Sequence, residues 1–196
     1  MMQVFDCQQG SPEWHECRRG IPTASEFATV MASGRGGAES KTRRTYLYKL
    51  AGEIITGEVT EGFSNAHMDR GREMEADARA AYAFMQDADP EAVGFIRNGR
   101  AGASPDSLLG IDGLLEIKTK LPHLLIETIL RGDMPPEHRA QVQGQLWITD
   151  RQWCDVAVFW PGMPLFVHRA NRDDAFISVL AAAVADFNSE LDEVVA

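Results

Sequence analysis

The sequence predicts an α/β protein of the α+β kind, in which a central mixed β-sheet is flanked by helices. Short segments typical of strands gather between residues 91 and 120 and again between residues 153 and 170. Segments with apolar residues at helical spacing precede, separate and follow these strands. Because no repeat or linker divides the 196 residues, we expect a single domain over residues 1–196.

Two short helices are expected near the N-terminus. A turn at residues 11–12 opens the first, which is amphipathic and ends before Gly20. The second is expected over Glu26–Met31, and either Thr23 or Ser25 can cap it by accepting hydrogen bonds from its free backbone N–H groups.

Two longer helices follow a Gly-rich loop over residues 33–40. The first is expected over Thr42–Ile55, with a core-facing stripe formed by Tyr46, Leu47, Leu50 and Ile54. The second, over Asn65–Asp87, is rich in strong helix formers and is the clearest helix in the chain.

The strands and the remaining helices fill the second half of the chain. Two short strands between residues 91 and 106 are joined at Asn98-Gly99, a dipeptide favoured in tight hairpin turns. A third strand is expected over residues 114–120, followed by a helix that starts at paired prolines and runs to about Thr149. Two more strands, over residues 153–160 and 163–170, precede a long final helix.

Composition limits the class of protein. With 44% hydrophobic and 24% charged residues the chain resembles an ordinary globular protein. No window approaches the roughly 20 apolar residues of a membrane span, and the N-terminus lacks the regions of a signal peptide. We therefore expect a cytoplasmic protein with no membrane partner. Cys7, Cys17 and Cys154 form no C-x-x-C pair, so free thiols are expected rather than disulfides.

The net charge of −10 argues against non-specific binding of nucleic acid, which needs locally concentrated Lys and Arg. Some concentration exists at Arg18-Arg19 and between residues 40 and 49. A nucleic-acid function would have to depend on these places.

Ionised residues interrupt the strand at residues 114–120. Glu116 and Lys118 are two apart, so they project to the same face of the strand. Asp106 precedes Glu116 by ten residues, and a hairpin can return it beside Glu116. Two adjacent carboxylates repel unless a cation neutralises them, and hard oxygen ligands suit Mg²⁺ or Mn²⁺. The spacing alone fits metal-assisted phosphodiester hydrolysis and a surface salt bridge between Glu116 and Lys118 about equally well.

Five ordered blocks carry a family resemblance: "GSPEWHECRRGIPTAS", "RGREMEADAR", "SPDSLLG", "LEIKTK" and "HRAQVQGQLWIT". Their order and spacing over about residues 10 to 150 resemble the lambda-exonuclease-like (YqaJ-type) phage recombination nucleases, which belong to the restriction-endonuclease-like PD-(D/E)XK superfamily. The resemblance implies a restriction-endonuclease-like core and a single exonuclease domain.

The resemblance also implies a metal site and a catalytic lysine. The expected metal ligands are Asp106, Glu116, the backbone carbonyl of Ile117, and Glu75. Lys118 is the implied catalytic lysine, and the implied cofactor is Mg²⁺, with two ions per site and Mn²⁺ as a substitute. For Glu75 the alternative is an ion pair within its helix, with Arg72 or Arg79.

Further site residues are implied on the helix after the strand. Gln141 matches the family glutamine that positions the attacking water and the lysine, while Gln145 and Gln143 are weaker candidates. His138 lies one turn from Gln141, either in the same cleft or exposed at the helix start.

The N-terminal block resembles a pocket for the 5′-phosphate of a DNA end. Its implied residues are Arg18, Ser25 and Ser104, because the planar fork of an arginine donates two hydrogen bonds to a phosphate. Arg19 replaces Arg18 if the helix is rotated. Trp14 is expected to be a core anchor rather than a stacking platform for a base.

Members of the resembled family degrade the 5′-ended strand of linear duplex DNA and leave a 3′ overhang for a single-strand annealing protein. Several form rings of three, which would turn basic surfaces inward and acidic ones outward, easing the charge problem. The expected partners are therefore double-stranded DNA ends, the annealing recombinase and two further copies in a homotrimer, in a bacterial or phage-infected cell. The Gly-rich loop, Arg43 and Arg44 are candidate duplex contacts, or else a solvated loop and an exposed helix start.

Two other functions remain open. An endonuclease of the same superfamily would cut a covalently closed circle. A DNA-end-binding module that has lost turnover is disfavoured, because crowded carboxylates do not help a protein that only binds phosphate. Relatives that carry an iron–sulfur cluster need four cysteines, whereas this chain has three.

Overall fold

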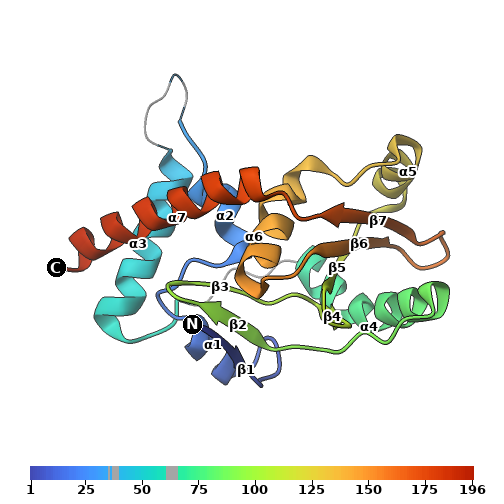
Figure 1. Cartoon of the computed structure of the whole chain (residues 1–196), viewed down its shortest axis with the longest axis horizontal. Coiled ribbons are helices and arrows are strands. Elements are labelled where there is room, and N and C mark those ends of the chain that lie inside the picture. Colours follow the sequence, from blue (N-terminus) through green and yellow to red (C-terminus); the bar gives the residue numbers. More distant parts are fainter. Residues whose placement is uncertain (35, 37–39, 61–65) are drawn as a thin grey trace.

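The computed structural model describes residues 1–34, 36, 40–60 and 66–196, and for residues 66–69 and 71–72 only the backbone (Figure 1). In chain order its elements are β1 (Met2–Phe5), α1 (Pro12–Arg18), η1 (Ala24–Glu26), α2 (Phe27–Val30), α3 (Lys41–Thr56), α4 (Ala66–Gln86), β2 (Phe95–Asn98), β3 (Ala101–Ala103), β4 (Ser107–Leu109), β5 (Gly113–Thr119), α5 (Pro122–Arg131), η3 (Pro136–His138), α6 (Arg139–Thr149), β6 (Trp153–Phe159), β7 (Phe166–Asn171) and α7 (Asp174–Val195).

The strands form two sheets rather than one. β1, β2 and β3 are antiparallel, while β4-β5-β6-β7 is mixed because β5 and β6 run parallel. The chain leaves the first sheet after Ala103 and enters the second at Ser107, and Pro105 lies between them. Proline has no N–H for a sheet ladder, which accounts for the interruption. The predicted mixed sheet flanked by helices is confirmed, with this division added.

The hairpin between β2 and β3 turns where the sequence indicates. Gly99 has a φ of 61°, a left-handed conformation that glycine adopts without strain. Asn98 and Ala101 are paired on either side of the turn.

The faces of β5 alternate as its sequence predicts. Leu115 and Ile117 pack with Ala78 and Tyr82 of α4 in one buried cluster. Leu114 packs on the other face with residues of α5, α6 and β6. Glu116 and Lys118 project to this second face, toward α6.

The helices α2, α3, α6 and α7 share a third cluster with β2 and β3. In Figure 1, α7, coloured red, lies across α3 and near α6. A side chain at Gly144 would collide with the ring of Phe27, at 2.3 Å from its Cδ2 atom, so glycine allows α2 to pack closely on α6. The C-terminal helix thus braces the helices that carry the candidate site.

Several local expectations are wrong. β1 and α5 both form, although neither element is predicted from the sequence. Neither Thr23 nor Ser25 caps the second short helix through its side chain, because Thr23 Oγ1 is engaged by Arg18 and Ser25 instead. Ile54, in the last turn of α3, is 40% exposed rather than in the core.

Other expectations are confirmed or fall outside the structure. The three cysteines are free thiols, although Cys7 and Cys17 lie close, with their Sγ atoms 4.0 Å apart. Within the described residues, no helix combines the length and the apolar character that crossing a membrane requires. Much of the predicted Gly-rich loop, at residues 35 and 37–39, lies outside the described residues.

Candidate active site

The open edge of β5 forms the centre of the candidate site. β4 begins at Ser107, which pairs with Leu115. Because the two strands are antiparallel, the residues of β5 after Leu115 extend past the first residue of β4 and have no partner strand there among the described residues. There the backbone N–H of Ile117 donates to Oδ2 of Asp106 at 2.5 Å. The carboxylate takes the place of the missing strand. Because the N–H and C=O of a strand residue point to the same edge, the Ile117 carbonyl also points toward this open position.

Glu116 is the most heavily hydrogen-bonded carboxylate in the site and is only 3% exposed. Its Oε1 atom accepts from Lys118 Nζ at 2.7 Å and from Gln141 Nε2 at 2.6 Å. Its Oε2 atom accepts from Gln145 Nε2 at 2.6 Å. Lys118 Nζ also donates to Gln141 Oε1 at 3.0 Å. The structure thus brings together Glu116, Lys118, Gln141 and Gln145, which are spaced one turn apart on α6 and two apart on β5.

Charge repulsion acts on Asp106. Burial, the nearby charge of Glu116 and, to a smaller extent, that of Glu75 raise the pKa of Asp106 well above its usual range, although the Ile117 hydrogen bond opposes them. For Lys118, burial lowers the pKa, but the charge and the hydrogen bond of Glu116 outweigh it and raise the pKa above the ordinary lysine value. Lys118 is therefore a protonated donor at neutral pH.

Glu75 reaches the same edge from α4. Its carboxylate forms an ion pair with Arg79, which is the alternative that the sequence left open; Arg72 has no described side chain. Arg79 also donates to the Asp106 carbonyl at 3.1 Å and to Ser107 Oγ at 2.9 Å. The Glu75–Arg79 ion pair of α4 therefore lies at the start of β4, next to Asp106.

The donor set fits a divalent cation in kind. In the described part of the chain, no three His, Cys, Asp or Glu side chains are gathered closely enough to ligate one ion. Glu75 is turned onto Arg79 and Glu116 onto Lys118. The charges of Glu75 and Glu116 nevertheless both act on Asp106, and only Oδ2 of that carboxylate is used in a described hydrogen bond. Crowded carboxylate oxygens of this kind are what Mg²⁺ neutralises.

A second constellation joins α1 to the segment before Asp106. Trp14 Nε1 donates to Ser104 Oγ at 2.8 Å, and the Arg18 guanidinium stacks 3.6 Å from the centroid of the Trp14 ring. Arg18 Nη2 donates to Thr23 Oγ1 at 3.3 Å, and that hydroxyl lies 3.3 Å from Ser25 Oγ. The three residues expected at a phosphate, Arg18, Ser25 and Ser104, are therefore linked through Trp14 and Thr23.

Arg18 is suited to an anion by what surrounds it. Among the described residues no carboxylate forms an ion pair with it, and burial lowers its pKa while nearby negative charges oppose that shift. An arginine guanidinium stays charged at neutral pH. Arg19, in contrast, is occupied by Glu16 at 2.8 Å and by the Gly57 carbonyl at 2.7 Å. Trp14 is half-buried and supports the guanidinium rather than anchoring the core.

Of the remaining candidates, His138 lies near Lys118, whereas Gln143 points away from the site. The His138 side chain is mostly buried, and burial together with the charge of Lys118 lowers its pKa to about 4. Its Nε2 atom has no hydrogen-bond partner among the described residues. Gln143 points away, donating to the Asn171 carbonyl and accepting from the Asp173 N–H, both at 2.8 Å. Gln143 therefore joins α6 to the start of α7.

Arg43, expected as a candidate duplex contact, is instead bonded within the protein. It donates to both carboxylate oxygens of Glu190 on α7, at 2.6 and 2.7 Å, and to the Val30 carbonyl at 3.1 Å. Its side chain is 14% exposed, so it clamps α3 to α7 rather than facing a duplex. Arg44 is exposed on the same helix.

Sequence reasoning missed the supporting residues. Arg79, Thr23 and a hydrogen-bonded trio, formed by the buried Tyr82 and Asp155 with the exposed Arg169, were not singled out for the site. Tyr82 donates to Asp155 at 2.7 Å, and Arg169 donates to the same carboxylate at 2.7 and 2.8 Å. This trio attaches α4, and with it Glu75, to β6 and β7. A buried aspartate in the strand "WCDVAVF" was the available signal.

Comparisons with known proteins find one family model and several solved structures that resemble this chain. The family model described as the YqaJ-like viral recombinase domain matches residues 13–152. The crystal structure of the alkaline exonuclease LHK-Exo from Laribacter hongkongensis is 36% identical, with a TM-score of 0.85 over 94% of each chain. LHK-Exo in complex with dAMP matches at 38% identity and a TM-score of 0.84, again over 94% of each chain.

A more distant match shows the fold alone. A phage related exonuclease from Haemophilus somnus 129PT has a TM-score of 0.68 at 11% identity, over 89% of this chain and 95% of that one. No curated protein sequence matches the chain. The restriction-endonuclease-like α/β fold expected from the sequence is confirmed by these likenesses.

Proposed function

This chain belongs to the YqaJ-like viral recombinase domain family, and from that membership we propose that it is a Mg²⁺-dependent DNA exonuclease. It hydrolyses the 5′-ended strand of linear duplex DNA in the 5′-to-3′ direction and leaves 3′ single-stranded overhangs. The name of the similar LHK-Exo, an alkaline exonuclease, and its complex with dAMP support this class of substrate.

One observation carries the proposal. Lys118 is held between Glu116 and Gln141, while Asp106 lies at the adjoining open edge of β5. A surface salt bridge would not need a buried glutamate with three hydrogen bonds. The arrangement instead sets a protonated lysine and the buried Glu116 beside the open edge of β5, where Asp106 lies.

Asp106, Glu116, Glu75 and the Ile117 carbonyl would hold Mg²⁺, or Mn²⁺ in its place, with two ions in each site. Bound Mg²⁺ supplies an activated water and neutralises charge on the phosphate. Glu75 and Glu116 would exchange Arg79 and Lys118 for the cation, and the repulsion on Asp106 favours that exchange.

The protein side chains orient and neutralise. Protonated Lys118 donates toward the scissile phosphate, where negative charge grows as the bond breaks. Gln141 fixes the lysine and can orient a water through its amide, and Gln145 holds the other oxygen of Glu116. Positioned in this way, each group is ready before substrate arrives.

Direction comes from the second constellation. Arg18, Ser25 and Ser104 bind the terminal 5′-phosphate, with the fork of Arg18 donating to its oxygens. Ser104 and Asp106 lie on one short segment, so capture of the terminal phosphate places the next phosphodiester at the metal-binding edge.

The test compares three DNA substrates. A 5′-phosphorylated linear duplex, its unphosphorylated counterpart and a covalently closed circle are incubated with Mg²⁺ or with EDTA, and the receding ends are mapped. We expect the phosphorylated 5′ ends to recede in the presence of Mg²⁺ and to stay intact in EDTA. Cleavage of the circle would instead support the endonuclease, and binding without cleavage would support a silent DNA-end-binding module.

We further propose a homotrimeric ring and a single-strand annealing protein that takes over the 3′ strand. The net charge of −10 supports a ring, since basic surfaces can face an enclosed duplex while acidic faces point outward. Light scattering should give three times the chain mass of 21.7 kDa. A mass of one chain would remove the ring.

A further inference from the structure

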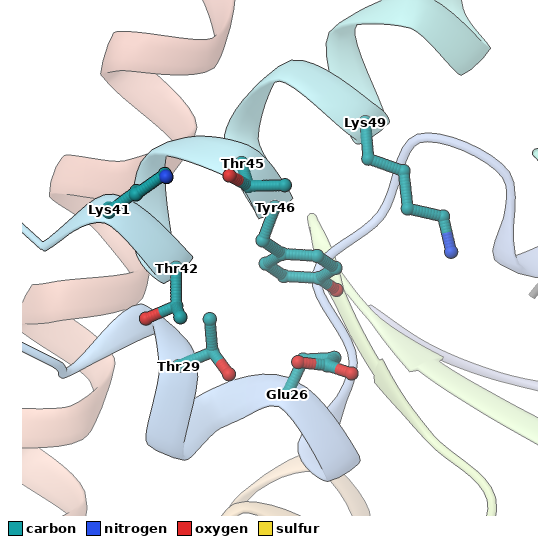
Figure 2. A pocket seen from close by; sticks show the side chains of 7 residues that line it. All are labelled: Glu26, Thr29, Lys41, Thr42, Thr45, Tyr46 and Lys49. Atoms are coloured by element: carbon teal, nitrogen blue, oxygen red, sulfur yellow. The ribbon is translucent and has the colours of Figure 1, made fainter. Parts of the chain in front are cut away.

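A pocket of about 360 Å³ lies between α2 and α3, apart from the residues discussed above. Glu26, Thr29, Lys41, Thr42, Thr45, Tyr46 and Lys49 line it (Figure 2). Figure 2 shows Lys41 toward one end and Lys49 toward the other, with Thr45 and Tyr46 between them on the same helix. The volume falls within the roughly 300 to 1,000 Å³ typical of small-ligand pockets.

The polar groups of the pocket are available to a ligand. Lys41, Thr45 and Lys49 are spaced four residues apart, so they share one face of α3. Among the described residues Lys41 has no ion-pair partner, and Lys49 approaches Glu53 only at 3.9 Å. The hydroxyls of Thr29 and Thr45 make no hydrogen bond within the same residues, so they remain free as donors.

The pocket adjoins the candidate phosphate constellation. The Tyr46 hydroxyl accepts from the Thr23 N–H at 3.3 Å, and Thr23 Oγ1 in turn accepts from Arg18. Burial raises the pKa of Tyr46 to about 12, so its hydroxyl stays neutral beside an anion. Glu26, next to Ser25, is the one acidic group in the lining. The two lysines therefore leave the pocket with a positive balance in a chain whose net charge is −10.

We propose that this pocket binds a sugar-phosphate unit of the bound DNA outside the reacting nucleotides. Lys41 and Lys49 each neutralise one of the two phosphates that flank the sugar, Thr29 and Thr45 donate to the phosphate oxygens, and the Tyr46 ring with the threonine methyl groups contacts the sugar. The proposal rests on the DNA-degrading function proposed above and extends it with a binding subsite. It also moves the DNA contact on α3 from Arg43, which is occupied by Glu190, to a different face of the helix.

Salt dependence of DNA binding tests the subsite. The variants are Lys41→Gln, Lys49→Gln, both together, and Thr45→Val, which keeps the shape of the side chain but removes the hydroxyl. Arg131→Gln is the matched control, because Arg131 is an exposed cation on α5 that does not line the pocket. Affinity is measured by fluorescence anisotropy in EDTA, which prevents turnover, from about 50 to 200 mM salt.

Two DNAs distinguish the strand that supplies the phosphate: a blunt duplex and a duplex with a 3′ single-stranded tail. A contact with the duplex lowers the slope of log affinity against log salt by about 0.9 per lysine on both DNAs. Over that fourfold salt range, the loss of affinity becomes about threefold smaller per lysine. A contact with the 3′ strand lowers the slope by about 0.7, and only on the tailed DNA.

The result that overturns the subsite is a slope equal to that of the parent in the double lysine variant on both DNAs. An equal change in Arg131→Gln would overturn it as well, since any surface cation would then do the same. Failure of the parent to bind or degrade DNA would instead refute the proposed function.

Discussion

Arg18 offers the sharpest test of how the enzyme would find a 5′ end. Its guanidinium makes one described hydrogen bond, to Thr23 at 3.3 Å, and stacks on Trp14, so its other N–H groups are free for a phosphate. A hydrogen bond to a charged group contributes about 1.5 to 3 kcal/mol. Since 1.4 kcal/mol is about tenfold, Arg18→Ala should lower kcat/KM on 5′-phosphorylated ends by about 10- to 150-fold.

The unphosphorylated duplex serves as the internal control. With no terminal phosphate to bind, its kcat/KM should be nearly the same in Arg18→Ala and the parent. Arg18→Lys should recover part of the loss, because a lysine keeps the charge but not the planar fork. An equal loss of kcat/KM on both kinds of DNA end would show that Arg18 supports the fold or general DNA binding. Recognition of the 5′-phosphate by Arg18 would then be refuted.

Five further changes probe the site and its support. Lys118→Ala should reduce hydrolysis by about 10²- to 10³-fold while DNA binding persists; an unchanged Mg²⁺-dependent rate would remove the lysine from the mechanism. Gln141→Ala should lower kcat by up to about 100-fold with little effect on stability. Gln143→Ala should do the reverse, reducing the free energy of unfolding by about 1 to 2 kcal/mol, and similar effects in both variants would contradict their opposite orientations. Because the folded-state pKa of Asp106 is raised, the metal-free parent should lose stability as pH rises above about 4, the ordinary aspartate pKa. Asp106→Asn should flatten that pH dependence in thermal unfolding and abolish cleavage, and an unflattened curve would mean that other groups dominate. Tyr82→Phe should lower the free energy of unfolding in urea by about 1.5 to 3 kcal/mol, since it removes a buried hydrogen bond to a carboxylate, and no loss would show that the bond is worth little.

The sequence predicted the parts of the fold that depend on local spacing. Because strand side chains alternate, Glu116 and Lys118 had to share a face, and they do. The turn at Asn98-Gly99 follows from the backbone freedom of glycine. Helix α5 was also recognisable, since Pro122 stands at its first turn and Gly132 ends it in a left-handed conformation.

Contacts between distant segments could not be predicted in this way. Trp14 and Ser104 are 90 residues apart, and nothing in either local sequence indicates their hydrogen bond. β1 is mostly exposed, so it lacks the alternation of a half-buried strand and exists through its pairing with β2. The role of Arg43 likewise depends on Glu190, which lies 147 residues further along the chain.

The late start of β4, at Ser107, explains why the candidate residues can meet. Glu116 projects toward α6, whereas α4 covers the opposite face, so a continuous β4 would separate Glu75 from Glu116. Since β4 starts only at Ser107, the edge of β5 beyond it is open to side chains from both faces. Asp106 occupies that edge, and Arg79 of α4 donates a hydrogen bond to the Asp106 carbonyl. A shift of the β4 start by two residues toward the N-terminus would close the edge with a backbone ladder, leaving the carboxylates on separate faces.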